Sequence, residues 1–131
     1  MEVAVPRGEP LRFLATHLDH RSDDRERRAA VETIEKLIGA KLTQPTILAG
    51  DLNAFPDSAV LDGFRRSWHV ASATEQTPTF PSDKPNRQID FILTCPAEAW
   101  KVVEFRVIEE RVASDHRPIL AVLEWKTARA K

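Results

Sequence analysis

The chain has 131 residues, of which 42% are apolar, enough for the core of one ordinary domain and too many for a disordered protein. Its 19 basic and 20 acidic side chains nearly cancel, which argues against a general attraction to nucleic acid or to membrane surfaces. The single cysteine, Cys95, excludes an intrachain disulfide and a thiol-rich metal site. Residues 1–10 lack an apolar leader and no run is long enough to span a bilayer, so a cytoplasmic protein is predicted.

The first part of the chain alternates predicted strands and helices. Residues 11–18 form a mostly apolar run of strand length that ends in polar side chains. A helix is predicted over residues 22–40, where apolar side chains recur at helical spacing behind a capping box. Residues 46–49 form a short apolar strand typical of burial on both faces, and residues 56–64 carry a short helical stretch. Residues 66–86 contain three prolines and are expected to be a long loop of functional importance.

The remainder of the chain is predicted to consist of strands. Residues 89–93 form an apolar strand that contains one carboxylate. Residues 101–108 alternate apolar and charged side chains, which predicts a strand with Val103 and Phe105 on the same face. Residues 119–125 form a last strong strand. This order of elements predicts a single α/β domain over the whole chain, with one mixed β-sheet and helices on one face.

Four segments place His, Asp or Asn at the end of an apolar strand, where ligand sites of open α/β sheets gather. They are Thr16-His17-Leu18-Asp19, Gly50-Asp51-Leu52-Asn53, Ile89-Asp90-Phe91 and Ser114-Asp115-His116-Arg117-Pro118. Each segment alone has a plainer interpretation, because strand-end Asp is often a turn residue and a single His is often structural. Asp90 is the hardest to explain in this way, since a carboxylate in a core strand is costly without a cation, a metal or a histidine as partner.

The motifs THLD, GDLN, IDFIL and SDHRP, in this order, resemble the C-terminal portion of the endonuclease/exonuclease/phosphatase family. That family includes deoxyribonuclease I, abasic-site endonucleases, sphingomyelinases and inositol-phosphate phosphatases. The resemblance covers residues 11–125 and implies a hydrolase that depends on Mg²⁺ or Mn²⁺ and cleaves phosphate esters by in-line attack of water. It also implies half of the four-layer deoxyribonuclease I-like α/β sandwich.

The resemblance implies a role for each polar residue of these motifs. Asp51 would orient or deprotonate the attacking water, and Asn53 would bind a phosphate oxygen or lie beside a metal. His116 would donate to a non-bridging phosphate oxygen, with Asp90 fixing its tautomer and keeping it cationic. His17 would make a second phosphate contact and protonate the leaving group. The residues expected at the metal are Asp51, Asn53 and Asp115.

The resemblance also implies parts that the sequence does not match. The family's complete domain is longer, and its N-terminal half supplies the Glu that is the main metal ligand. The ligands found here would alone hold Mg²⁺ weakly, because hard cations prefer several oxygen atoms. The apolar strands over residues 46–49 and 119–123 expect cover on both faces, so one sheet face is expected to be an exposed apolar patch. Three explanations stay open, namely a fragment, pairing with a separate N-terminal chain, or a homodimer.

Three functions therefore compete. The first is a phosphoesterase, or its catalytic half, acting on a nucleic acid, a lipid headgroup or a small phosphate ester. The second is a non-catalytic interaction module, or inactive fragment, that oligomerises through the exposed sheet face. The third is a generic α/β binding domain in which the four motifs coincide by chance.

The long loop is expected to shape the substrate pocket. Trp68 and Phe80 would stack a base there, although aromatic side chains at such positions often anchor a loop on the core. Arg87, with Lys84, would meet a phosphate group, although exposed cations near turns are often only solvated. We therefore predict Trp68 and Arg87 as substrate-binding residues.

Overall fold

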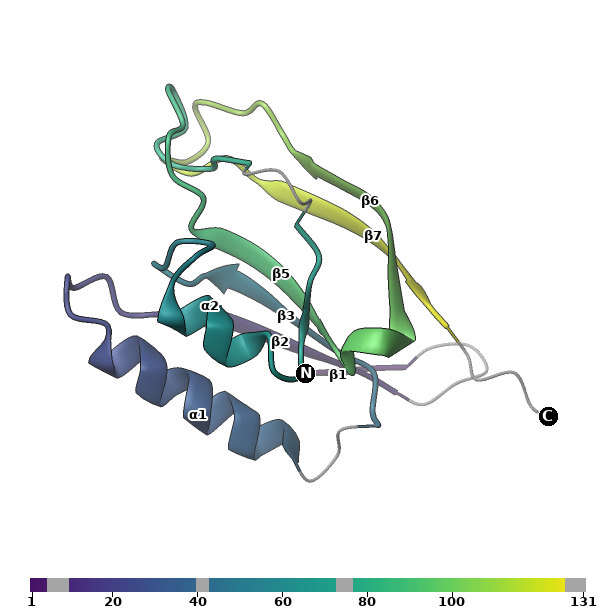
Figure 1. Cartoon of the computed structure of the whole chain (residues 1–131). Coiled ribbons are helices and arrows are strands. Elements are labelled where there is room, and N and C mark those ends of the chain that lie inside the picture. Colours follow the sequence, from purple (N-terminus) through teal and green to yellow (C-terminus); the bar gives the residue numbers. More distant parts are fainter. Residues whose placement is uncertain (5–9, 40–42, 73–76, 127–131) are drawn as a thin grey trace.

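The computed structural model of the chain describes residues 1–4, 10–39, 43–72 and 77–126. In this part, two helices cover one face of a central sheet, and a separate two-stranded ribbon curves away above it (Figure 1). The elements in chain order are β1 (Glu2–Val3), β2 (Leu11–His17), α1 (Arg25–Gly39), β3 (Thr46–Asp51), α2 (Ala59–Phe64), β4 (His69–Val70), β5 (Asp90–Cys95), the 3₁₀ turn η1 (Ala97–Ala99), β6 (Trp100–Val107) and β7 (Ile119–Trp125). No helix among the described residues is both long and apolar enough to cross a membrane.

The central sheet has the strand order β1-β2-β3-β5-β4. Strands β2 and β3 are parallel, and the other neighbours are antiparallel. The register pairs His17 with Asp51 across β2 and β3, and Asp51 with Asp90 across β3 and β5. Three of the four polar motifs therefore meet at the same end of three adjacent strands.

The hydrophobic core lies between the sheet and the two helices. Its sheet side, called the inner face below, includes the buried side chains Leu48, Phe91 and Leu93. The helices contribute Val31 and Ile38 from α1, and Val60, Leu61 and Phe64 from α2. Ser58 caps α2, because its side-chain oxygen accepts a hydrogen bond from the backbone N–H of Leu61 at 3.4 Å. This packing fixes the positions of the strand ends that carry the polar motifs.

The opposite side of the sheet, called the outer face below, is less well covered. Side chains alternate along a strand, so the residues between the inner-face positions point outward. The outer-face side chains Phe13, Ile47, Ala49 and Ile92 are only half-buried. Ala49 and Ile92 line one cavity together with Pro118 and Ile119, so the start of β7 lies on this side of the sheet. The outer face is therefore apolar and half-buried rather than the exposed patch expected from the sequence, with β7 over part of it.

The mixed α/β architecture with helices on one face agrees with the sequence prediction. The prediction of one sheet was wrong for the last two strands, because β6 and β7 pair only with each other. The turn η1 redirects the chain directly after β5, so β6 does not continue the central sheet. The predicted helix 22–40 begins at Arg25 in the structure, and its expected end at Ala40 lies outside the described residues, as do residues 73–76 of the predicted loop.

The alternation predicted for residues 101–108 was also wrong at one position. A register shift lies between Val102 and Glu104 in the pairing of β6 with β7. Val103 is consequently 56% exposed, while Val102 and Phe105 are half-buried. An extra residue in one strand reverses the direction of every side chain that follows it, so Val103 and Phe105 do not share a face.

Candidate active site

The candidate site begins with three side chains on the outer face of the sheet. His17, Asp51 and Asp90 are register partners on β2, β3 and β5, so their side chains project in the same direction. Asp51 and Asp90 are 15% exposed, and His17 is 73% exposed. The strand ends thus place two carboxylates and one imidazole side by side at the rim of the sheet.

The turn after β3 is tied to the end of β2 by Asn53. This residue has a φ of 47°, a left-handed conformation that asparagine tolerates better than most residues. Its backbone N–H donates to Oδ1 of Asp51 at 2.8 Å, and its side-chain amide donates to the carbonyl of Leu18 at 2.9 Å. Leu18 N–H in turn donates to the Asp51 carbonyl at 2.9 Å. Asn53 therefore holds Asp51 in place, a structural task that the sequence prediction did not assign to it.

His116 reaches the site from the loop between β6 and β7. Four hydrogen bonds join that loop to the segment before β5, and the longest of them runs from the Ser82 hydroxyl to the Arg111 carbonyl at 3.3 Å. Arg117 N–H donates to the Thr79 carbonyl at 2.8 Å, and Ser82 N–H donates to the Asp115 carbonyl at 2.7 Å. The Nε of Arg117 donates to the Ser82 carbonyl at 2.7 Å. These bonds position His116 over Asp90 although the two residues are 26 positions apart in the chain.

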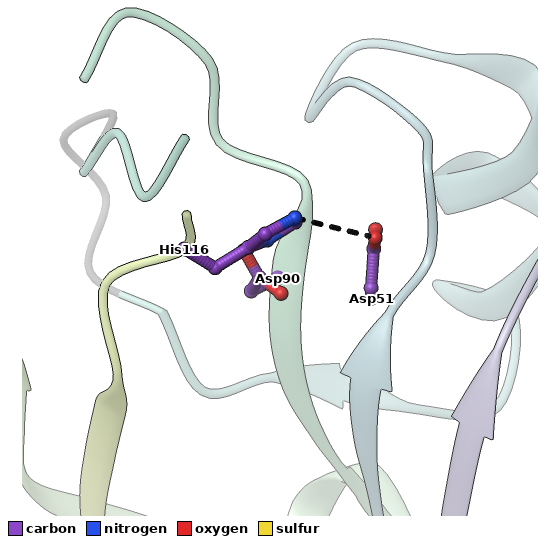
Figure 2. A group of neighbouring side chains, drawn as sticks. All are labelled: Asp51, Asp90 and His116. Atoms are coloured by element: carbon purple, nitrogen blue, oxygen red, sulfur yellow. Dashed lines mark hydrogen bonds and ion pairs between the residues drawn. The ribbon is translucent and has the colours of Figure 1, made fainter. Parts of the chain in front are cut away.

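Figure 2 shows the central group of Asp51, Asp90 and His116. The Nδ1 of His116 lies 2.9 Å from Oδ2 of Asp90, and because an ionised carboxylate can only accept, Nδ1 carries the proton. Thr79 donates its hydroxyl hydrogen to the same Asp90 oxygen at 2.5 Å. The Nε2 of His116 faces Oδ2 of Asp51 at 3.9 Å, and His17 Nε2 lies 3.5 Å from that oxygen. Oδ2 of Asp51 thus lies close to both imidazoles.

The surroundings of His116 favour its protonated form. Partial burial disfavours the imidazolium, but the hydrogen bond and charge of Asp90 and the charges of Asp51 and Asp115 outweigh it. The pKa of His116 is therefore raised above its ordinary value of 6.5. A positioned imidazolium beside a carboxylate can stabilise negative charge on a phosphoryl oxygen.

Asp51, Asp90 and His116 also form a possible metal site. Each offers one ligand atom, and these atoms lie within 4.8 Å of one another. Divalent cations accept carboxylate ligands, whereas His116 could be a ligand only in its neutral form, because an imidazolium has no free lone pair. Because Oδ2 of Asp90 already accepts hydrogen bonds from Thr79 and His116, Asp51 has the more available carboxylate oxygen. The two carboxylates fit a divalent cation that binds through one or two carboxylates and keeps several waters.

The structure does not bring every predicted site residue into this group. Asp115 is exposed on the loop before His116 and is not a member of the three-residue cluster. Arg87 is exposed, with its guanidinium carbon 4.6 Å from the centre of the Phe80 ring, and that ring lies 4.8 Å from the His116 ring. Arg87 is therefore connected to the site through the Phe80 ring, which contacts His116 as well.

The prediction of Trp68 as a substrate-binding residue was wrong. Its side chain is 2% exposed and belongs to the hydrophobic core, where it meets Phe64 edge-on at 6.1 Å. Its indole N–H donates to Oε1 of Glu35 on α1 at 2.7 Å. A substrate base has no access to a ring that is enclosed in this way.

We expect Trp68→Ala to lower the free energy of unfolding by roughly 3–5 kcal/mol, because a large buried ring is removed and Glu35 loses its partner. Trp68→Phe keeps most of the buried volume and is expected to cost less. Urea denaturation of both variants measures the difference. If Trp68→Ala left the stability unchanged and weakened phosphate binding, the prediction of Trp68 as a substrate-binding residue would be correct.

Sequence reasoning missed Thr79, which is fully buried and donates to Asp90. No sequence pattern marks it, because it lies in the proline-rich loop rather than at a strand end. The Asp90 carboxylate did point to an unidentified partner, and the structure supplies two, Thr79 and His116. The motif residues Asp51, Asp90, His17 and His116 are brought together as a group.

The larger of two cavities does not lie at the central group of Asp51, Asp90 and His116. A cavity of about 360 Å³ lies against Asp90, His116 and the outer face. A groove of about 680 Å³ lies between α1 and α2, lined mostly by alternating charges and without a histidine. The smaller cavity is lined by Asp90 and His116, two members of the central group, so we place the site on this side of the sheet.

Comparisons with known proteins agree with this fold. The Endonuclease/Exonuclease/phosphatase family model matches residues 2–116. A functionally unknown conserved protein from Enterococcus faecalis is 24% identical with a TM-score of 0.76, and the match covers 91% of this chain and 52% of that protein. A mannosyl-6-phosphatase from Bacteroides thetaiotaomicron is 22% identical with a TM-score of 0.71, covering 91% and 53%. D. rerio TDP2 complexed with single-strand DNA product is 18% identical with a TM-score of 0.72, covering 94% and 59%.

These likenesses concern the fold, and the chain spans only about half the length of the solved structures that it matches. No curated protein matches the sequence. The family match extends from β1 to His116, so it includes the first three polar motifs and the fourth as far as His116. The chain belongs to the Endonuclease/Exonuclease/phosphatase family.

Proposed function

We propose that this chain acts in the hydrolysis of a phosphate ester by in-line attack of water. One observation carries the proposal: Oδ2 of Asp51 lies 3.5 Å from His17 Nε2 and 3.9 Å from His116 Nε2. Phosphoryl transfer needs an aligned water, neutralised phosphoryl oxygens and a proton for the leaving oxygen. A carboxylate close to two imidazoles supplies groups for all three tasks.

In this proposal each residue has one task. Asp51 orients the attacking water and accepts its proton, while His116 donates from Nε2 to a non-bridging phosphoryl oxygen. Asp90 holds His116 through Nδ1, so that Nε2 faces the substrate, and the charge of Asp90 favours the imidazolium. His17 is exposed and can give a proton to the leaving oxygen. Asn53 acts through the turn that holds Asp51.

We also propose that the reaction uses Mg²⁺ or Mn²⁺. When bound, such an ion neutralises phosphoryl charge and makes a coordinated water more acidic. Asp51 would hold it, with waters and substrate oxygens completing the coordination. Asp115 stays a predicted additional ligand of the metal, because it directly precedes His116 and its side chain is exposed. Cytoplasmic location is part of the proposal and suits Cys95, a buried thiol whose pKa burial raises to about 11.

The test is hydrolysis of bis-p-nitrophenyl phosphate and p-nitrophenyl phosphate with Mg²⁺, Mn²⁺ or EDTA. We expect turnover that EDTA removes, and a loss of about 100-fold in Asp51→Asn because the water loses its base. Asp62→Asn is the matched control, since Asp62 is an exposed helix residue paired with Arg65. Equal rates in Asp51→Asn and Asp62→Asn would show that Asp51 has no part in the chemistry.

A second candidate function is favoured by the surface of the chain. The outer face is half-exposed and apolar, which suits a partner surface such as a second copy or a complementary half of the fold. This candidate, an oligomerising module without catalysis, requires a stable oligomer that is independent of metal. Sedimentation equilibrium that gives a monomer at micromolar concentration would exclude it.

A further inference from the structure

Arg87, Phe80 and His116 form a contact group at the rim of the site, with the Phe80 ring contacted by the other two side chains. The guanidinium carbon of Arg87 lies 4.6 Å from the centre of the Phe80 ring, within the range of a cation–π contact. The Phe80 ring lies 4.8 Å from the imidazole of His116. The Arg87 guanidinium and the His116 imidazole therefore both contact the same aromatic ring.

Backbone hydrogen bonds also hold Phe80 and Arg87 in place. Phe80 N–H donates to the Arg87 carbonyl at 3.0 Å, and Arg87 N–H donates to the Phe80 carbonyl at 3.0 Å. Thr79 N–H donates to the same Arg87 carbonyl at 2.8 Å, and the Thr79 hydroxyl holds Asp90. The segment that orients the Asp90–His116 pair thus also determines where Arg87 is placed.

The charge of Arg87 is not neutralised within the described part of the chain. Five other arginines contact a nearby carboxylate, namely Arg21, Arg25, Arg65, Arg106 and Arg111. No such ion pair involves Arg87 among residues 1–4, 10–39, 43–72 and 77–126. When a guanidinium packs its face against an aromatic ring, its N–H donors lie in the guanidinium plane and can still bind another acceptor. Arg87 is exposed, so those donors can meet a ligand.

The same contacts reduce the chance of recognition by base stacking. Trp68 is enclosed in the core, and the Phe80 ring is already in contact with Arg87 and His116. Neither of the aromatic residues expected to stack a base offers an unoccupied surface comparable to a stacking platform. The rim is therefore better suited to bind a charged group than to stack a base.

We propose that Arg87 forms a second anion subsite beside the scissile phosphate, so that the preferred substrates carry two phosphate groups linked to each other. The inference rests on the proposed function, which places the scissile phosphate between Asp51 and His116. Arg87 would then bind the neighbouring phosphate through paired N–H donors. The second phosphate is joined to the first directly in a diphosphate and through a sugar in adjacent nucleotides, and both present the same charged oxygens to Arg87.

Isothermal titration with inorganic pyrophosphate and with orthophosphate, in buffer without divalent metal, tests the subsite. The wild type is expected to bind pyrophosphate about tenfold more tightly than orthophosphate. Arg87→Met keeps an unbranched stem against Phe80 and should remove that preference while leaving orthophosphate binding unchanged. Arg66→Met is the matched control, because Arg66 is an exposed arginine at the groove between α1 and α2. A 5′-phosphorylated dinucleotide, titrated in parallel, shows whether phosphates separated by a sugar use the same two positions.

The outcomes separate the inference from the function on which it rests. Binding of neither anion would remove the phosphate site itself, and the subsite with it. Binding of both anions with equal affinity in wild type and Arg87→Met would overturn the subsite and leave the proposed function standing. A preference lost equally in Arg66→Met would show a general charge effect and would also overturn it. Loss of the pyrophosphate or dinucleotide preference in Arg87→Met alone supports the subsite and identifies which spacing it accepts.

Discussion

Replacing Gly50 by alanine is expected to lower the free energy of unfolding by about 4 kcal/mol and the melting temperature by roughly 10 °C or more. Gly50 lies at the end of β3, directly before Asp51, with a φ of 155° that side-chain-bearing residues seldom adopt. A Cβ at this position would lie 1.8 Å from the carbonyl oxygen of Thr16 on β2. Because that neighbour is backbone of the parallel strand, relief requires β2 and β3 to move apart.

Gly39→Ala is the control for this prediction. Gly39 ends α1, and a Cβ there would meet nothing within 4 Å, so little change in melting temperature is expected. Thermal unfolding followed by circular dichroism compares the two variants with the wild type. Equal melting temperatures for Gly50→Ala and the wild type would mean that β2 and β3 are not held as close together as the structure shows. Loss of phosphate binding in a folded Gly50→Ala sample would instead reflect displacement of Asp51.

The strand ends were predictable from sequence because their side chains follow simple rules. Apolar runs that finish in Asp, His or Asn indicate sites at sheet edges, and the register His17–Asp51–Asp90 follows from pairing those strands. Asp90 was informative for a further reason, since a carboxylate in a core strand needs a partner. That requirement predicted a cation, a metal or a histidine as partner, and the family resemblance implied His116, whose Nδ1 lies 2.9 Å from Oδ2 of Asp90 in the structure.

Features that were not predicted from the sequence depend on contacts between segments that are far apart in the chain. The separate ribbon of β6 and β7 results from the turn after β5, and the shift at Val103 results from one extra residue in the pairing. Neither leaves a pattern in a single strand. Trp68 was predicted to bind substrate because it is an aromatic residue at the start of the long loop. Its position after α2 instead places it in the core beside Phe64. Thr79 acts through one hydroxyl, and a lone Thr in a loop has no distinguishing pattern.

Asp90→Asn is expected to have the largest effect on the chemistry. Asparagine keeps the shape of the side chain but removes the charge of Asp90, so only the charges of Asp51 and Asp115 would then oppose the effect of burial on His116. The pKa of His116, raised in the wild type, should fall. Hydrolysis should decrease by about 10²–10⁴-fold, because the cation facing the phosphoryl oxygen is lost at neutral pH. Proton NMR titration of the His116 ring measures the pKa, and Asp62→Asn serves as the control that should leave it unchanged.

The same variant has a predictable effect on stability against pH. Because the pKa of His116 is raised in the folded state, the folded protein binds this proton more tightly than the unfolded chain does. That stabilisation is complete below the unfolded pKa of about 6.5 and is lost as the pH rises through the folded value. The difference in melting temperature between wild type and Asp90→Asn should therefore be largest near pH 5–6 and should diminish at alkaline pH. A difference that grows with pH would show that the Asp90–His116 pair is not the ion pair that the structure indicates.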